Sequence, residues 1–522
     1  MRSRLRQGVL GTITAVAVTL SPLAFTVPAA AHPGGHSGHH PGGDAVRKLV
    51  KDVSGKNVKK HLQALQAIAK ANGGTRVSGT PGFDASRDYV ARKLRSAGYD
   101  VTIQPFEFTF DGYVTPPVLK QNSPVAKTYT YGFFSDYVAM GDSPAGTVTG
   151  TIQPVDLVLP PGPAANTSNS GCEASDFAGF VAGNVALMQR GTCNFRVKVD
   201  NAMAAGASAA IVFNEGQAGR TEVDLNPVLG GPGVTIPSFF ARFAVGQELA
   251  AAAGTTVTMN WDPIVETRTT YNVIAQSRKG DPANVVMMGA HLDSVQEGPG
   301  INDNGSGSAG ILEVALQFAK TRPKNQVRFA FWGAEEFGLL GSEHYVAALT
   351  EEERAKITLY LNFDMIASPN YTFGIYDGDG DAFGTAGPPG SDVIEEDFEK
   401  FFAGRGLPFT ATAFTGRSDY GAFIAAGIPA GGLFTGAEEL KTAEEAAIFG
   451  GTAGVPLDPC YHSVCDTIKN INDKALDVNS DAVATLVATY AFDTGTIGTA
   501  SAPATAARSG GAHGHKPADA QS

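Results

Sequence analysis

The sequence predicts an α/β fold: a mixed, mostly parallel sheet flanked by helices, with a smaller β-rich α+β segment inserted into it. Before residue 124, apolar residues recur at helical spacing and then alternate as in a strand. Between residues 124 and 261 the sequence instead shows short β-like runs separated by loops. From Tyr271 onward, apolar strands alternate with amphipathic helices. This last pattern is typical of βαβ units, which form parallel sheets covered by helices on both faces.

The first 31 residues have the features of a secretory signal peptide. Three Arg lie within the first seven residues, residues 8–27 are almost uncharged and apolar, and residues 28–31 (PAAA) provide an A-x-A-like cleavage site. A membrane anchor is the alternative, but no stop-transfer cluster of charges follows. No later run reaches the ~20 apolar residues that a spanning helix needs. We therefore expect a secreted protein without a membrane anchor.

Low-complexity segments flank the part of the chain that is expected to fold. Residues 32–43 (HPGGHSGHHPGG) are too rich in Gly to pack, and they form either a disordered spacer or a weak metal-binding tract. Residues 496–522 have a similarly low complexity and are expected to be a disordered or trimmed tail. Between these segments we expect one principal domain over 44–123 and 262–495, interrupted by an inserted domain over 124–261.

Each expected element follows from a local pattern. In the first part, residues 44–71 and 86–97 have helical spacing, and residues 99–110 alternate as a strand. In the insert, strands are expected over 147–151, 155–159, 185–189 and 209–213, and a helix over 195–205. After Tyr271 the apolar strands are VVMMGAHLDSV, QVRFAFW and ITLYLNFDMI, and the helices span 306–320 and 338–349. In sheets of this kind, ligands bind beyond the carboxyl ends of the strands.

The composition is that of a soluble, loop-rich globular protein, with 63 Gly among 522 residues and 17% charged residues. Removal of the signal peptide would take away three Arg and no acid, and would shift the net charge from −12 to −15. A surface with this excess of acids argues against nucleic acids and anionic membranes as partners.

The number and placement of the Cys residues indicate disulfides. The chain has four Cys, an even number that suits an exported protein. Cys460 and Cys465 are five residues apart, and Cys172 and Cys193 lie together in the insert, so two local disulfides are expected. A Cys-ligated zinc is the alternative, but the sequence contains no C-x-x-C spacing.

Acids and imidazoles follow the strands after Tyr271, at the points where these strands end. A lone His or Asp at such a position is more often a cap or an ordinary loop residue, but here the set is large. Gathered at one edge of a sheet, the groups would repel one another and lose hydration, at a cost of several kcal/mol, unless they share a positive charge. Two divalent cations would supply that charge. The residues are His291, Asp293, Asp303, Glu335, Glu336 and Asp364, and, in a later loop, Tyr461 and His462.

Zinc accepts imidazole and carboxylate ligands together, and a pair of zinc ions about 3.5–4 Å apart suits hydrolysis. The adjacent acids Glu335 and Glu336 fit such a centre, because neighbouring residues on a turn point in different directions. Glu336 can then ligate a metal while Glu335 faces a substrate as general base. The alternative for this pair is a solvated helix start, where acids suit the positive end of the helix dipole.

Five motifs resemble those of the di-zinc aminopeptidases of peptidase family M28, especially the secreted bacterial and aminopeptidase Y-like enzymes: GAHLDSV, GINDNGSG, WGAEEFGLLGS, NFDM and CYHSVCDT. The insert, with RGTCNF and NAMAAGASAAIVFN, resembles a protease-associated (PA) domain. The resemblance implies a zinc-exopeptidase (phosphorylase/hydrolase-like) fold with two zinc ions per chain. It also implies a secreted metallo-aminopeptidase that releases N-terminal, mainly apolar, residues from peptides.

The resemblance further implies a role for each motif residue. Asp293 would orient the ring of His291, and Tyr461 would stabilise the oxyanion. Glu335 would activate a metal-bridging water as general base and return the proton to the leaving amine. One zinc would be held by His291 and Asp364, the other by Glu336 and His462, with Asp303 bridging the two.

Similarity to the family also suggests where the substrate binds. The free α-amine would be held near Glu335, Asp364 and Arg417, although Arg417 could instead form a structural ion pair with Asp419. Phe434 would line an apolar pocket for the first side chain. The expected partners are peptides or proteins with a free N-terminus, and the chain is expected to be a monomer.

A calcium site is a further expectation. Asp477 and Asp481 match positions that bind calcium in some members of the family, although two acids at a helix start are more often caps.

Three other functions remain compatible with this architecture. A carboxypeptidase of the same fold would need several Arg to hold a terminal carboxylate, and only Arg417 lies near the motifs. A glutaminyl cyclase would use one zinc ion. A catalytically inactive PA/M28-like binding protein should have lost metal ligands, whereas all of them are present here.

Overall fold

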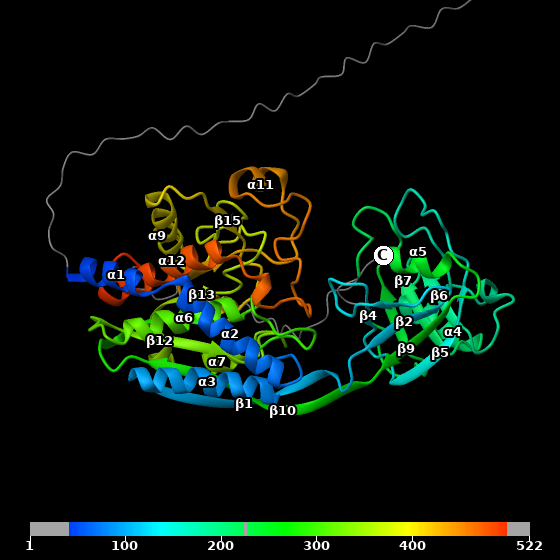
Figure 1. Cartoon of the computed structure of the whole chain (residues 1–522), viewed down its shortest axis with the longest axis horizontal. Helices are drawn as coiled ribbons and strands as arrows, with labels where there is room; N and C mark the ends of the chain where they lie inside the picture. Colours follow the sequence, from blue (N-terminus) through cyan, green and yellow to red (C-terminus); the bar gives the residue numbers. More distant parts are fainter. Residues whose placement is uncertain (1–40, 224–226, 498–522) are drawn as a thin grey trace, which may run out of the picture. The chain divides into compact units, whose positions relative to one another are not determined.

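The computed structural model describes residues 41–223 and 227–497. The signal peptide expected over 1–31 lies outside the described residues, as do residues 32–40 of the His-rich segment and residues 498–522 of the expected tail. Within the described ranges the chain forms two eight-stranded sheets with helices packed around them (Figure 1). None of the helices in these ranges combines the length and the apolar composition that crossing a lipid bilayer requires.

The first sheet is mixed and mostly parallel at its centre, as the sequence predicts. Its strands, in spatial order, are β1 (Asp100–Tyr113), β10 (Pro263–Gln276), β12 (Asn325–Trp332), β11 (Asp281–His291), β13 (Ile357–Phe363), β16 (Ala430–Phe434), β14 (Gly374–Tyr376) and β15 (Thr410–Thr412). The four strands β12, β11, β13 and β16 run parallel, whereas β1, β10 and β12 pair antiparallel. The carboxyl ends of the parallel strands therefore meet at one edge.

Helices cover both faces of this sheet, because alternate residues of each central strand point to opposite sides. On β11, Met288 belongs to one apolar core and Met287 to the other. The larger core packs against α1 (Pro41–Asp52), α2 (Gly55–Ala71), α3 (Pro81–Ala97), α6 (Gly305–Phe318), α9 (Ser391–Gly404) and α12 (Asp473–Phe492). The smaller core packs against α7 (Leu340–Ala348) and α10 (Tyr420–Ala425). The connections contain α8 (Glu351–Ala355), α11 (Ala443–Phe449) and the 3₁₀ turn η2 (Ile468–Asn470).

Two sequence predictions differ from the structure in their details. The helical pattern over 44–71 forms two helices, because Ser54 caps a new helix by accepting a hydrogen bond from the Asn57 amide at 3.3 Å. The strand expected over 155–159 is wrong. β5 (Gly146–Pro154) ends before it, and Asp156 has a φ of 41°, which takes the chain out of the extended conformation.

The second sheet contains the strands of the insert and also β2, at residues 118–123, which the sequence assigned to the principal domain. Its strands, in spatial order, are β3 (Lys127–Tyr129), β2 (Val118–Ser123), β9 (Thr256–Trp261), β5, β6 (Val185–Gln189), β7 (Ala209–Phe213), β8 (Ser238–Ala241) and β4 (Tyr137–Ala139). The helices are α4 (Phe195–Ala204), α5 (Phe243–Ala250) and the 3₁₀ turn η1 (Ala174–Phe177). Residues of α4 belong to the core on one face and residues of α5 to the core on the other. The predicted Cys172–Cys193 disulfide is present in this part of the chain.

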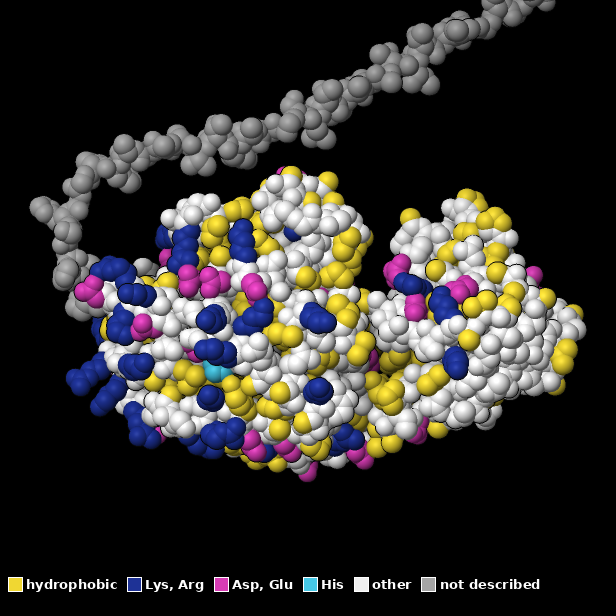
Figure 2. Space-filling view, in the orientation of Figure 1, with side chains coloured by type: hydrophobic (Ala, Val, Ile, Leu, Met, Phe, Trp, Pro, Cys, Tyr) yellow, Lys and Arg dark blue, Asp and Glu magenta, His cyan; other side chains and the backbone are white. Residues whose placement is uncertain are grey.

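One antiparallel ribbon carries both chain crossings between the two sheets. β1 and β10 pair continuously from Asp100 opposite Gln276 to Tyr113 opposite Pro263, and the chain enters the second sheet at this end. On the face shown in Figure 2, Lys and Arg side chains gather over the helices of the first sheet, and the insert carries far fewer charges.

Candidate metal centre and active site

The acids and imidazoles identified in the sequence meet at the carboxyl edge of the central parallel strands. His291 is the last residue of β11, Asp364 directly follows β13, and Glu335 and Glu336 lie on the turn that follows β12. Asp303 comes from the loop that leads into α6. His462 and Tyr461 come from a loop near the C-terminal end of the described chain, more than 90 residues after β13.

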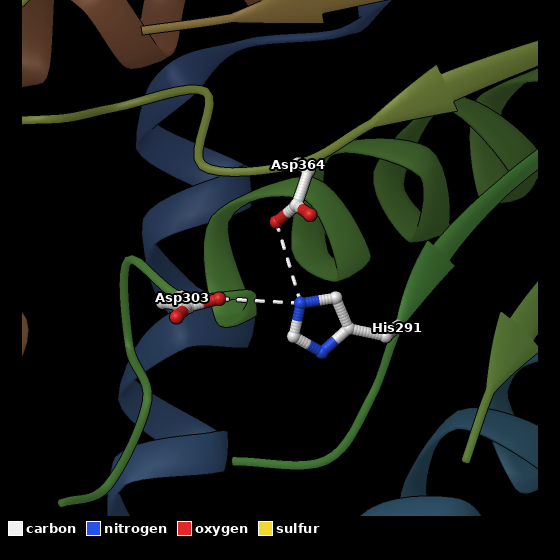
Figure 3. A group of neighbouring side chains, drawn as sticks. All are labelled: His291, Asp303 and Asp364. Atoms are coloured by element: carbon white, nitrogen blue, oxygen red, sulfur yellow. Dashed lines mark ion pairs between the residues drawn. The ribbon is translucent and has the colours of Figure 1, made fainter. Parts of the chain in front are cut away.

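Two groups of potential ligands share Asp303. His291, Asp303 and Asp364 form the first group, shown in Figure 3, and Asp303, Glu336 and His462 form the second. The Nε2 atom of His291 lies 3.2 Å from Asp303 Oδ1 and 3.3 Å from Asp364 Oδ1. The Nε2 atom of His462 lies 3.1 Å from Asp303 Oδ2 and 3.1 Å from Glu336 Oε2. The two carboxylate oxygens of Asp303 therefore face different imidazoles.

Four of these five side chains are no more than 10% exposed, and the fifth, His462, is 23% exposed. Burial affects their protonation. Burial, together with the nearby Asp303, raises the pKa of Glu336 to about 7. Burial would lower the pKa of His291, but the carboxylates of Glu335 and Asp364 raise it well above its ordinary value. Asp364 Oδ1 and Glu336 Oε1 are buried without a hydrogen-bond partner among the described residues. Oxygen and imidazole donors left unsatisfied around two adjacent points fit the coordination that zinc accepts.

Glu335 and Asp293 lie beside this cluster. Glu335 Oε2 is 3.8 Å from His291 Nε2, and burial raises the pKa of Glu335 well above its ordinary value. Asp293 Oδ1 lies 3.5 Å from His291 Nδ1 and accepts a hydrogen bond from the Glu335 amide. A solvated helix start for the acid pair is wrong: α7 begins only at Leu340, and Glu335 is 8% exposed.

Arg76 holds the loops of this centre together and was missed in the sequence. The side chain is fully buried and donates to the backbone carbonyls of Leu292, Pro299 and Gly300, between His291 and Asp303. Burial lowers its pKa to about 10, against the opposing effect of carboxylates that include Asp293. The sequence shows only an Arg in the loop GGTRVSGT, and an Arg in such a loop is usually exposed to solvent.

Ser418 and Asp466 were also missed. The Ser418 hydroxyl donates to Asp364 Oδ2 at 2.6 Å, which fixes that carboxylate. Asp466 accepts hydrogen bonds from the amides of Asn302 and Asp303, at 2.8 and 3.0 Å. In the sequence, a loop Ser or Asp that supports a metal ligand looks the same as any other loop Ser or Asp.

The His462 loop is closed by the predicted Cys460–Cys465 disulfide. His462 has a φ of 50°, an uncommon conformation for a residue other than Gly. Asn470 donates to both Asp458 and Asp466, which ties the two ends of the loop to each other. The loop thus presents Tyr461 and His462 from a narrowly constrained turn.

A small cavity of about 90 Å³ adjoins the cluster, and both predicted substrate residues, Arg417 and Phe434, line it. An ion pair of Arg417 with Asp419 is wrong: Arg417 instead donates to both carboxylate oxygens of Glu438, at 2.7 and 3.3 Å. Its Nη2 atom also donates to the Tyr461 hydroxyl at 3.3 Å. Both oxygens of Asp419 are buried without a hydrogen-bond partner among the described residues.

The two proposed calcium residues contact protein groups. Asp477 Oδ1 accepts a hydrogen bond from the Gly55 amide, and Asp481 forms an ion pair with Arg405 at 2.6 Å. Their interpretation as helix caps is wrong, because Asn472 caps α12 and both acids lie within the helix.

Comparison with known proteins adds to this geometry. The family model described as Peptidase family M28 matches residues 272–487, and the one described as PA domain matches residues 154–249. An aminopeptidase of Pseudomonas aeruginosa (strain UCBPP-PA14) is 50% identical over 440 residues, 84% of this chain and 81% of the relative. The chain belongs to peptidase family M28. The resemblances to M28 and to a PA domain are thereby confirmed.

Further comparisons agree with this family and with zinc. A protein of Aspergillus fumigatus named "Probable leucine aminopeptidase 2" is 45% identical to this M28 peptidase over 423 residues, 80% of the chain and 79% of the relative. A solved zinc aminopeptidase from Bacillus subtilis is 26% identical, with a TM-score of 0.55, covering 84% of this chain and 94% of its own. The ligand types of the M28 peptidase described above suit that metal.

Proposed function

We propose that this M28 peptidase is a zinc-dependent aminopeptidase that uses two zinc ions to remove N-terminal, mainly apolar, residues from peptides. The observation that carries this proposal is the pair of ligand groups that share Asp303, with Glu335 beside them. His291, Asp303 and Asp364 would hold one ion and Asp303, Glu336 and His462 the other. When bound, the ions would act as Lewis acids that polarise the scissile carbonyl and lower the pKa of a water.

Glu335 is the proposed general base. Its carboxylate is buried beside both ligand groups but belongs to neither of them. Its position beside His291 and outside the ligand groups suits a group that accepts a proton from water and returns it to the leaving amine. Asp293 would hold the His291 ring in place, since it lies against Nδ1 and is also bound by the Glu335 amide.

Tyr461 is the proposed donor to the oxyanion that develops as water attacks the carbonyl. Arg417 donates to the Tyr461 oxygen, so the phenol proton is free to point toward the substrate. Glu438 fixes the Arg417 guanidinium through a two-pronged ion pair. Arg417 thus positions Tyr461 in this proposal.

The size of the small cavity favours removal of single residues. Its volume of about 90 Å³ is well below the roughly 300–1,000 Å³ of typical ligand sites, which suits a single side chain. Phe434, Tyr376 and Tyr420 give the cavity an apolar wall, and Glu335 and Asp364 would attract a free α-amine. Arg417 is the only Arg among the described residues that line it, and Glu438 already neutralises it, which disfavours a carboxypeptidase.

The protein is further proposed to be secreted and to be a monomer. The two disulfides suit an oxidising compartment. Size-exclusion chromatography of the secreted protein tests the monomer. Calcium at Asp477 and Asp481 stays a prediction from the sequence; thermal unfolding with and without EGTA tests it.

The proposal is tested by hydrolysis of leucine p-nitroanilide with and without a zinc chelator. Turnover should disappear with the chelator, and elemental analysis should find two zinc ions per chain. Glu335→Gln should lower kcat by about 10²–10⁴-fold while zinc content is retained. Glu343→Gln, an exposed acid on α7, is the matched control and should keep full activity. Turnover that is insensitive to the chelator would refute the assignment.

A further inference from the structure

A second, much larger cavity shares two of the proposed metal ligands with the small one. It has a volume of about 650 Å³, and Glu336 and His462 line both this cavity and the small one. The remaining walls come from the β1–β10 ribbon, from the insert and from the loop at 295–297. We name it the downstream cleft. Its volume falls within the roughly 300–1,000 Å³ that is typical of ligand sites.

The insert brings the start of the downstream cleft against the catalytic loop. The ring of Phe134, which is 37% exposed, lies 5.1 Å from the ring of Tyr461 and 6.1 Å from that of His462. Phe133, the preceding residue, is 41% exposed and lines the cleft itself. The cleft is therefore continuous with the metal centre.

Aromatic rings form one wall of the cleft. Tyr131 and Trp261 stack with ring centroids 6.1 Å apart, and Tyr113 packs edge-on against Tyr131 at 5.7 Å. The Trp261 indole donates to the Ser143 carbonyl at 3.1 Å, which fixes the orientation of its ring. Rings held in this way present faces that attract ammonium and guanidinium groups.

Three acidic side chains give the downstream cleft negative charge. Asp111, Asp142 and Glu297 line the cleft, and the described lining residues include no Lys or Arg. Burial and the neighbouring Asp142 raise the pKa of Asp111 above its ordinary value, as expected where positive charge is lacking. A cation entering the cleft would meet both aromatic faces and acids.

We propose that the downstream cleft binds the substrate residues that follow the scissile bond and favours Lys or Arg side chains among them. The inference rests on the proposed aminopeptidase function and deepens it. The small cavity holds the first residue, so the rest of the peptide has to leave through the open side of the centre. An extended chain advances about 3.3–3.6 Å per residue, so a cation two or three residues after the cut lies within the cleft.

The test compares peptides that differ only after the cut. Leu-Ala-Arg-Ala and Leu-Ala-Ala-Arg amides are set against the same peptides with Glu in place of Arg, and kcat/KM is measured for each. The Arg peptides should be favoured by roughly tenfold, since ion pairs add to cation–π contacts and Glu is repelled. The preference should shrink in 0.5 M NaCl, because exposed charges are screened.

Paired variants locate the effect. Asp111→Asn combined with Asp142→Asn should reduce the Arg preference to about twofold or less. The second substitution keeps a side-chain oxygen that can accept the hydrogen bond that the Gly231 amide donates to Asp142. The control combines Asp156→Asn with Glu222→Gln, two exposed acids of the insert outside the cleft lining. The control removes the same charge and should retain the preference.

Two results would overturn the proposal. One is an Arg-to-Glu ratio within twofold of unity in the unaltered enzyme; the other is a preference that the Asp111/Asp142 pair of substitutions leaves intact. Leucine p-nitroanilide separates these outcomes from a failure of the proposed function, because it carries no residue after the cut. If it is hydrolysed in a zinc-dependent manner while the peptide ratios are flat, only the inference about the cleft fails.

Discussion

Glu335 and Glu336 are joined by one peptide bond, yet their carboxylates face different partners. Glu336 lies against His462, and Glu335 lies against His291. The chain leaves β12 through Ala334, which has a φ of 53° and whose amide donates to the Ser78 hydroxyl at 2.7 Å. This fixed turn separates the two carboxylates, so that one can bind metal while the other handles protons.

Arg76 offers a prediction at the same scale. Arg76→Lys should weaken zinc binding and lower thermal stability, because a single ammonium cannot reach the three carbonyls that the guanidinium holds. Each buried carbonyl left unpaired costs about 1–3 kcal/mol. Zinc affinity by chelator competition and Tm by calorimetry measure both effects. Arg278→Lys, at an exposed pair with Asp100, is the control. Equal zinc affinity in Arg76→Lys and the unaltered protein would contradict this role.

Several of the site residues predicted from the sequence lie at or just after strand ends, whereas those that were missed support the site through contacts with distant loops. His291 ends β11, Asp364 directly follows β13, and Glu336 lies on the turn after β12, so their convergence follows from sheet geometry. Arg76 and Asp466 act on backbone groups of loops 216 and 163 residues away in sequence. Local pattern carries no information about such pairings, since any loop Arg or Asp would look the same.

At the scale of elements, the turn after β14 and the helix α9 make a second acidic site. Glu395 on α9 is 9% exposed and accepts hydrogen bonds from the amides of Gly378 and Asp379. Burial, helped by Asp379 and Asp377, raises its pKa to about 7. The folded state therefore keeps a proton that the unfolded chain releases above its ordinary pKa of about 4.3. The stability linked to this proton is present below that value and is lost as the pH rises through about 7.

Glu395→Gln should consequently raise Tm at pH 8 relative to the unaltered protein, and the difference should vanish toward pH 4.5. Calorimetry at both pH values measures it. Glu396→Gln, an exposed neighbour paired with Lys400, should show no comparable rise. Asp377, Asp379 and Glu395 also lie close enough to hold a cation, and a bound cation would make the ionised Glu395 stabilising. In that case Glu395→Gln would lower Tm at pH 8, which would contradict the prediction.

Element prediction succeeded where periodicity is long and failed where it is short. β6 and β7 in the insert match the expected ranges, β13 lies within the expected apolar run, and α6 begins one residue before the expected range of 306–320 and ends two residues short of its end. β14 and β15 have three residues apiece, too few to show a period. They form because β14 pairs with the edge of β16, and β15 then pairs with β14. Such strands depend on tertiary contacts that no local window contains.

For the whole molecule, metal removal should lower stability as well as activity. Without zinc, the buried acids around Asp303 keep their mutual repulsion uncompensated. Zinc present at about 100 times its dissociation constant would add roughly 2.7 kcal/mol to the free energy of unfolding. Calorimetry should therefore show a zinc-dependent rise in Tm. Glu335→Gln is the control, because it should lose most activity but show the same rise. An unchanged Tm on zinc addition would contradict the prediction.

The pairing of Tyr113 with Pro263 makes the insert removable without cutting the first sheet. Because these residues lie opposite each other, a two-residue Asn-Gly turn could join them in place of residues 114–262 and close β1 and β10 as an ordinary hairpin. The remaining chain would keep each strand, ligand and loop of the metal centre while losing half of the residues that line the downstream cleft. The metal centre and the residues of the insert that line the downstream cleft can therefore be altered independently of each other.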